Sequence, residues 1–252
     1  MNRLTKIKEI RATLSSGGVS VGSWMQIPNS SIGEIMGDAG YDWIAVDMEH
    51  GTVSNHQLPD IFRAIELGNT LPVVRLASGA AKECKQALDA GAGGVIVPMV
   101  ESASQLTKVR DACRWPPSGN RGVGFSRANL FGKNFATYTR EAQSPLLVAM
   151  IEDVRAIETL DSILAVEGLD AIFIGPYDLS ASMGLTSQFD HSDFIDVMQQ
   201  INCLANKYDV ASGIHVVSTS TEELNSRIKE GYRFMAYSID AVMLQSAVTR
   251  PV

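Results

Sequence analysis

The segment from Trp43 to Gly51 reads WIAVDMEHG, a run of strand-forming apolar residues that ends in Asp47, Glu49 and His50. Ionisable groups are costly along the middle of a strand buried on both faces, but water or a metal ion can reach them at its end. The segment therefore predicts a buried strand whose carboxyl end carries a site. A surface turn after a strand is the plainer interpretation of this segment taken alone.

Similar apolar runs recur along the whole chain. The eight candidate strands cover residues 19–27, 43–48, 72–76, 94–100, 146–151, 171–175, 212–217 and 233–239. Amphipathic segments with helical spacing lie between most of them, at residues 54–68, 80–90, 102–113, 154–166, 191–207 and 219–231. This alternation indicates parallel strands joined by crossover helices. Eight such units predict a single-domain (β/α)8 TIM barrel over residues 1–252.

A doubly wound open sheet is the competing α/β architecture. It is disfavoured because no GxGxxG motif opens a helix after the first strand and no P-loop motif is present. One stretch interrupts the alternation: residues 115–144 form a long insertion rich in Gly, Asn and Arg, with five aromatic residues. Insertions of this length are often functional, so we expect an ordered loop that shapes the substrate entrance or a subunit contact.

Composition narrows the class of protein. Hydrophobic residues make up 45% of the 252 and charged residues 19%, as in ordinary globular domains. No apolar run approaches the length of about 18 residues that a membrane-spanning helix needs, so we expect a cytoplasmic protein without a membrane partner. The net charge of −7 argues against nucleic acid as a partner. Cys84, Cys113 and Cys203 show no CxxC spacing and are predicted to be buried apolar residues.

Ionisable residues gather at the predicted strand ends, which share one face of a parallel barrel. Arg75 lies in the third strand, Glu152 follows the fifth and Asp178 follows the sixth. A salt bridge closing the barrel mouth would explain any one of them, but the set together favours a site. Glu152 and Asp178 follow neighbouring strands, and a bound cation would relieve the repulsion between them. Two carboxylates completed by water and substrate suit Mg²⁺ or Mn²⁺.

Other residues could support this site. Asp47 and Glu49 are candidates for holding the loop and the metal ligands in position. The turn from Gly175 through Tyr177 to Asp178 leads from a strand into a helix, whose free N–H groups could bind a carboxylate or phosphate of the substrate. The alternative is that Asp178 simply caps its own helix.

Histidines are the remaining candidates for proton transfer. His50, at the end of a strand, is the best candidate general base of the four in the chain. Its tautomer would need a carboxylate partner, for which Asp89 is a candidate. His215, within the seventh strand, is expected to be a core or mouth residue with a structural hydrogen bond.

The segments DMEHG, VVRLA, LDAGAGGVIVPMV, MIEDV and GLDAIFIGPYDLSASMG closely resemble the metal-dependent, class II pyruvate aldolases of the HpcH/HpaI family. The resemblance runs from about Gly22 to Asp240. It implies a (β/α)8 barrel that assembles as a homohexamer, with a C-terminal helix swapped between subunits. It also implies reversible cleavage of a 4-hydroxy-2-keto acid, of the 2-keto-3-deoxy sugar acid type, into pyruvate and an aldehyde in carbohydrate or aromatic catabolism.

The resemblance also implies roles for individual residues. Glu152 and Asp178 would bind Mg²⁺, Mn²⁺ or Co²⁺, with no organic cofactor, and His50 would be the acid/base polarised by Asp89. Arg75 would stabilise the carbonyl and enolate oxygen, and the backbone of Gly175 and Tyr177 would bind the pyruvate carboxylate. Met150 departs from the family, where many members have a Gln that contacts the substrate. Since Met offers no N–H donor, substrate orientation or range is expected to differ here.

Other chemistries stay open at this point. A Schiff-base aldolase needs a buried Lys on a barrel strand, and none of the eight candidate strands contains one. Related members of the family decarboxylate oxaloacetate. A CoA-thioester lyase would need a basic cluster for the CoA phosphates, which the sequence does not supply. A noncatalytic barrel would keep the strands and lose the ionic residues.

Overall fold

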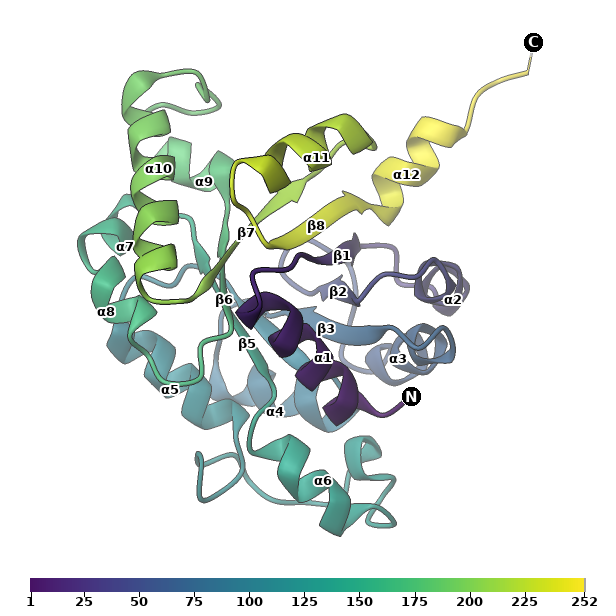
Figure 1. The fold of residues 1–252 in the computed structure, drawn as a ribbon. Coiled ribbons are helices and arrows are strands. Elements are labelled where there is room, and N and C mark those ends of the chain that lie inside the picture. Colours follow the sequence, from purple (N-terminus) through teal and green to yellow (C-terminus); the bar gives the residue numbers. More distant parts are fainter. Residues whose placement is uncertain (252) are drawn as a thin grey trace.

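A computed structural model describes residues 1–251 and shows a closed barrel of eight parallel strands in sequence order (Figure 1). The strands are β1 (Ser20–Met25), β2 (Trp43–Asp47), β3 (Leu71–Arg75), β4 (Gly94–Val97), β5 (Leu146–Ile151), β6 (Ala171–Ile174), β7 (Ala211–Val216) and β8 (Phe234–Ile239). Each pairs with the next, and β8 pairs with β1 to close the barrel. The prediction of a (β/α)8 barrel is confirmed.

Helices surround the barrel (Figure 1). They are α1 (Arg3–Ser15), α2 (Ser30–Asp38), α3 (Leu58–Leu67), α4 (Ala81–Ala90), α5 (Ala103–Cys113), α6 (Phe135–Ala142), α7 (Val154–Glu158), α8 (Leu160–Leu164), α9 (Pro176–Ser182), α10 (Ser192–Lys207), α11 (Thr221–Lys229) and α12 (Asp240–Ala247), with a 3-10 turn η1 (Arg127–Asn129). The segment expected as one helix after β5 is divided at Thr159 into α7 and α8. None of the helices within residues 1–251 combines the length and the apolar character needed to cross a membrane.

Two apolar cores hold the fold together. The larger lies between the strands and the surrounding helices, and the smaller fills the barrel. Inside the barrel, the rings of Trp43 and Phe234 stack with centroids 4.4 Å apart. Gly22 faces this stack, because a side chain there would come within 2.1 Å of the Trp43 ring. Ile7 and Ile10 of α1 join the inner core, so α1 closes the amino end of the barrel.

Residues 115–144 fold against this closed end. Trp115 is buried against Phe135 and Tyr138, with ring centroids 5.3 and 5.2 Å apart. Arg3 of α1 bonds to Glu141 of α6 (2.6 Å). Within the described chain, no residue of 115–144 lines the cavity at the strand ends. The expectation that this segment shapes the substrate entrance is therefore wrong for a single chain, while a subunit contact stays a prediction.

The cysteines lie in two different environments. Cys84 on α4 and Cys113 on α5 are buried and close enough to affect each other, so that the pKa of the Cys84 thiol is lowered and that of Cys113 is raised. Helix packing thus brings together two residues that are 29 positions apart in the sequence. Cys203 on α10 is exposed, which corrects the prediction that all three are buried.

Candidate active site

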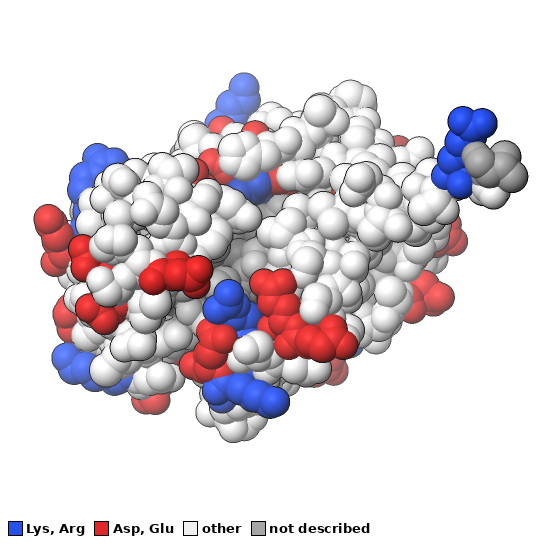
Figure 2. Space-filling view, turned by 90° about the horizontal axis from the view of Figure 1, so that it is seen from above, with Lys and Arg blue, Asp and Glu red and all other residues white. Residues whose placement is uncertain are grey.

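A cavity of about 290 Å³ opens at the carboxyl ends of the strands. Its lining residues are Trp24, Gln26, His50, Arg75, Met150, Glu152, Phe173, Ile174, Gly175, Pro176, Tyr177, Asp178, His215, Val217 and Ile239. Six strands (β1, β3, β5, β6, β7 and β8) and the loop after β2 therefore contribute to one site. On the face of the molecule seen in Figure 2, Lys and Arg side chains are scattered among Asp and Glu and form no basic patch, in keeping with the net charge of −7.

Arg75 and Asp47 form the centre of an ionic network beside this cavity. The last residues of β2 and β3 are in register, which places the two side chains next to each other. Arg75 donates from Nε and Nη2 to the two carboxylate oxygens of Asp47 (2.9 and 2.5 Å), and its Nη1 lies 3.0 Å from Glu49 Oε2. Burial opposes ionisation of Asp47, but the bonds and charge of Arg75 outweigh it and hold the pKa at about 2.

Asp47 also fixes the loop that follows β2. Its Oδ1 accepts bonds from the backbone N–H groups of Glu49 (3.0 Å) and His50 (3.2 Å). Gln26, at the end of β1, donates from Nε2 to the other oxygen (3.0 Å). Sequence reasoning missed Gln26, although it ends an apolar strand in the same way as Asp47 does. Trp24, also missed, lies under the Arg75 guanidinium, 5.2 Å from the ring centroid.

Glu152 is a buried carboxylate with few compensating groups. It is 3% exposed, and its Oε1 accepts a bond from the backbone N–H of Met99 (2.6 Å). Burial raises its pKa to about 7; the Met99 bond lowers it, while the charges of Glu49 and Asp178 raise it further. Gly175 makes room for this carboxylate, because a Cβ at that position would lie 2.7 Å from Glu152 Oε2.

Asp178 enters the cavity from the first turn of α9. The N-cap of this helix is Gly175, and no side chain caps it, so the alternative that Asp178 caps its own helix is wrong. The first backbone bond of α9 runs from Leu179 N to Gly175 O (2.9 Å). The N–H groups of Tyr177 and Asp178 precede that bond and have no acceptor within the helix. The Tyr177 ring is half exposed and packs edge-on against Phe189 at the rim.

The donor set at this mouth fits a hard divalent cation. Glu49, Glu152 and Asp178 interact electrostatically with one another, and Arg75 is the cation that faces them. Over residues 1–251, no three His, Cys, Asp or Glu side chains converge closely enough to hold an ion by themselves. An ion bound here would therefore take the rest of its oxygen ligands from water or substrate, as Mg²⁺ and Mn²⁺ commonly do.

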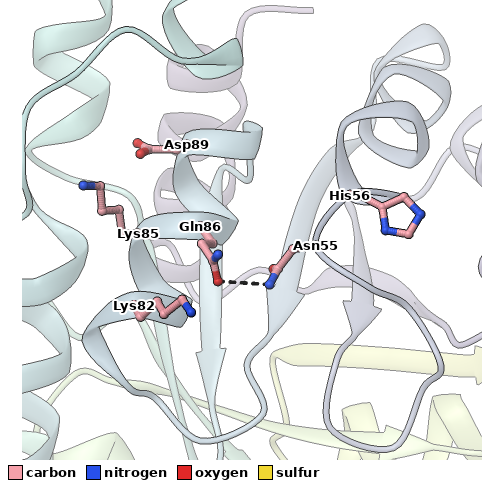
Figure 3. A pocket seen from close by; sticks show the side chains of 6 residues that line it. All are labelled: Asn55, His56, Lys82, Lys85, Gln86 and Asp89. Atoms are coloured by element: carbon pink, nitrogen blue, oxygen red, sulfur yellow. Dashed lines mark hydrogen bonds between the residues drawn. The ribbon is translucent and has the colours of Figure 1, made fainter.

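The structure places His50 at the cavity but leaves Asp89 outside it. His50 lines the opening with an exposed imidazole. Asp89 lies in the last turn of α4, and Arg121 Nη1 is 3.5 Å from its Oδ1. It lines a different hollow, between α3 and α4 (Figure 3), together with Asn55, His56, Lys82, Lys85 and Gln86. Within one chain Asp89 therefore does not polarise His50, because α4 runs back toward the amino end of the barrel.

The floor of the cavity is mostly apolar. Met150 is 4% exposed and lies with Phe173 and Trp24 in the inner core. His215 packs its ring against Trp24, with centroids 5.1 Å apart, and its Nε2 lies 2.9 Å from the backbone oxygen of Ser238. Burial lowers the pKa of His215 to about 4, so its ring is neutral at physiological pH.

Residues 20–247 match the family described as HpcH/HpaI aldolase/citrate lyase. A hydroxypyruvate/pyruvate aldolase of Roseobacter denitrificans is 37% identical over 243 residues, which cover 94% of this chain and 93% of that protein. A 2-keto-3-deoxy-L-rhamnonate aldolase of Klebsiella pneumoniae is 35% identical over 240 residues, covering 94% and 89%.

Solved structures show the same likeness. A crystal structure of an HpcH/HpaI aldolase/citrate lyase family protein from Burkholderia cenocepacia superposes with a TM-score of 0.88, at 29% identity and 95% coverage of both chains. The resemblance read from the DMEHG and GPYDLSASMG segments is thereby confirmed. The chain belongs to the HpcH/HpaI aldolase/citrate lyase family.

Proposed function

We propose that this protein is a metal-dependent pyruvate aldolase, a lyase that reversibly cleaves a 4-hydroxy-2-keto acid into pyruvate and an aldehyde. One observation carries the proposal: Glu152 and Asp178 line one cavity with the guanidinium of Arg75, which also pairs with Glu49, beside the free N–H groups of α9. The names of the related aldolases support the same reaction class.

Glu152 and Asp178 would hold the divalent ion. When bound, the ion acts as a Lewis acid toward the carboxylate and keto oxygens of the substrate. It would also compensate the charges of Glu49 and Asp178, which add to the effect of burial in raising the pKa of Glu152. Mg²⁺, Mn²⁺ and Co²⁺ all accept such oxygen ligands, so these residues do not select one of the three, and activity with each ion has to be measured.

The protein's own residues account for binding and proton transfer. The N–H groups at the start of α9, at Tyr177 and Asp178, would bind the substrate carboxylate. His50 would take the proton from the C4 hydroxyl as the C3–C4 bond breaks; the aldehyde leaves, and the bonding electron pair passes into the enolate of pyruvate. Arg75, fixed by Asp47, supplies a positive charge for the enolate oxygen. Protonation at C3 then yields pyruvate.

We also propose a homo-oligomer, of which the family resemblance implies a hexamer. Helix α12 extends away from the barrel (Figure 1), and its Leu244 is 50% exposed. A groove of about 850 Å³ between α10 and α11 is lined largely by apolar residues, among them Phe194 and Met198. A swapped α12 from another subunit would cover such a groove. In that assembly the role implied for Asp89 would have to be filled by a second subunit.

The test is metal-dependent release of pyruvate. Protein treated with EDTA is assayed against a panel of 4-hydroxy-2-keto acids, with lactate dehydrogenase as the coupling enzyme and with Mg²⁺, Mn²⁺ or Co²⁺ restored. We expect cleavage with metal and none without it. Pyruvate release from oxaloacetate alone would assign a decarboxylase instead. Light scattering after gel filtration tests the oligomer, and a monomeric mass would contradict it.

A further inference from the structure

His215 has a chemical feature that the reaction above does not use. It lies on β7 and lines both the cavity with Arg75 and Glu152 and the groove between α10 and α11. The residue is partly buried, and Trp24 and Phe173 are the aromatic neighbours of its ring. What remains accessible of this residue therefore faces the cavity and the adjoining groove.

The hydrogen bond to Ser238 defines which ring nitrogen carries the proton. A backbone carbonyl can only accept, so His215 Nε2 donates to Ser238 O across 2.9 Å. The acceptor is held in place, because Ser238 has a left-handed backbone (φ 55°) and its hydroxyl donates to Val217 O at 3.1 Å. Since burial keeps the imidazole neutral, Nδ1 carries a lone pair and is an acceptor.

This acceptor is unused within the protein. No donor among residues 1–251 reaches His215 Nδ1, and the atom is not among the unpaired polar atoms sealed from solvent. Water can therefore satisfy it in the free protein. When substrate displaces that water, an acceptor left unpaired would weaken binding, so a substrate that brings its own donor is favoured.

The surroundings of Nδ1 determine which kind of donor fits. Trp24, Phe173, Met150 and Ile239 supply the apolar part of the cavity lining. Glu152 and Asp178 are assigned above to the metal ion, and Arg75 to the enolate oxygen. A small neutral donor, such as an alcohol hydroxyl, is the group that suits a neutral acceptor beside apolar walls.

We propose that His215 is a specificity-determining residue whose Nδ1 accepts a hydrogen bond from a substrate hydroxyl, so that the enzyme prefers reactants with a hydroxyl next to the reacting carbonyl. The proposal rests on the aldolase function proposed above and names its substrate class. The hydroxyl can be carried by the aldehyde, as in glycolaldehyde, or by the nucleophile, as in hydroxypyruvate.

The experiment compares matched substrates in the direction of synthesis. In one arm, pyruvate reacts with glycolaldehyde or with propanal; in the other, propanal reacts with hydroxypyruvate or with 2-oxobutanoate. Each pair exchanges a hydroxyl for a methyl group. For wild type, His215→Leu and His215→Asn, the ratio of kcat/KM for the hydroxyl over the methyl substrate is measured with Mn²⁺ present.

We expect the wild-type ratio to exceed one in the arm whose hydroxyl meets Nδ1, and His215→Leu to lower that ratio about tenfold. His215→Asn, which keeps an acceptor near the same place, should restore part of it. His56→Leu, at the hollow between α3 and α4, is the control and should keep the wild-type ratio.

Two results would overturn the proposal. One is a ratio that His215→Leu leaves unchanged in both arms. The other is an equal loss for all substrates that His215→Asn does not recover, which would make the residue structural. Failure of the aldolase function looks different, because the wild-type protein would then form no product in either arm.

Discussion

The two ends of the barrel both bury charged side chains, but the amino end holds a network of balanced ion pairs and the carboxyl end leaves a surplus of carboxylates. At the amino end, Arg3 lies 3.1 Å from Glu66 and 2.6 Å from Glu141, and Arg127 lies 2.5 Å from Glu66. Two guanidiniums thus balance two carboxylates. Such a network joins α1, α3, α6 and η1 and needs no further ligand.

At the carboxyl end, Arg75 is the cation that faces Asp47, Glu49, Glu152 and Asp178. Asp47 uses most of that charge through two hydrogen bonds, so the other three carboxylates are poorly compensated. The comparison teaches that burial of charge alone does not mark a site. A site is indicated by an excess of buried carboxylates over cations, which destabilises the free protein and is relieved by a bound cation.

The largest effect is expected from removing the carboxylates proposed as ligands. Glu152→Ala and Asp178→Ala should each lower kcat/KM for pyruvate release at least about a thousandfold, because the Lewis acid contributes several kcal/mol. Titration calorimetry with Mn²⁺ should show lost binding. Asp161→Ala, which removes an exposed carboxylate paired with Lys207, is the matched control. Retained Mn²⁺ binding in both ligand variants would refute the assignment.

The next largest effect is expected from removing the proposed general base, which should affect turnover but not metal binding. His50→Ala should lower kcat about 10²- to 10⁴-fold, the usual contribution of a general acid/base. Its Mn²⁺ affinity should stay close to wild type, because the imidazole lies at the cavity and outside the proposed ligand set. Wild-type turnover in this variant would remove His50 from the mechanism.

The two ends should respond oppositely when a charge is neutralised. In EDTA-treated protein, Arg3→Met should lower the free energy of unfolding by about 3–5 kcal/mol, since Glu141 loses its partner in a buried site. Glu152→Gln should leave it unchanged or raise it, because the amide still accepts from Met99 without the repelled charge. Urea denaturation measures both. Equal destabilisation by the two variants would contradict the difference in charge balance between the two ends.

The smallest effect is the pH dependence of the metal-free protein. Glu152 has a pKa of about 7 when folded against 4.5 as its ordinary value. Between these values the folded state binds more protons than the unfolded state, so stability falls as pH rises. The shift corresponds to about 3 kcal/mol at most. The difference between wild type and Glu152→Gln, followed by urea denaturation from pH 5 to 8, should show this fall. A difference in the free energy of unfolding that does not change with pH would mean that folding does not raise the pKa of Glu152.

The barrel could be predicted because its signals are local. Each of the eight apolar runs overlaps a strand, and the amphipathic segments between them contain helices. Residues at strand ends could be gathered into one list, since parallel strands share a face. Gln26 is a polar residue directly after β1, and that signal could have added it to the list.

Other features depend on contacts that spacing does not encode. Asp89 lies in a segment with helical spacing, and that spacing does not show which end of the barrel the last turn of the helix reaches. For His215 we expected a structural hydrogen bond, which Ser238 accepts, but the accessibility of the second ring nitrogen depends on how Trp24 and Phe173 pack around it.

The sequence by itself determined the alternation of strands and helices and placed Asp47, Arg75, Glu152 and Asp178 at strand ends. These features arise from hydrophobic periodicity, which acts over neighbouring residues. Only the tertiary structure decided how the charges balance, because the pairing of Arg75 with Asp47 depends on the register of β2 and β3 and the exclusion of Asp89 depends on the direction of α4. Charge compensation falls off within a few ångströms, and distances of that size are set by the packed fold rather than by position along the chain.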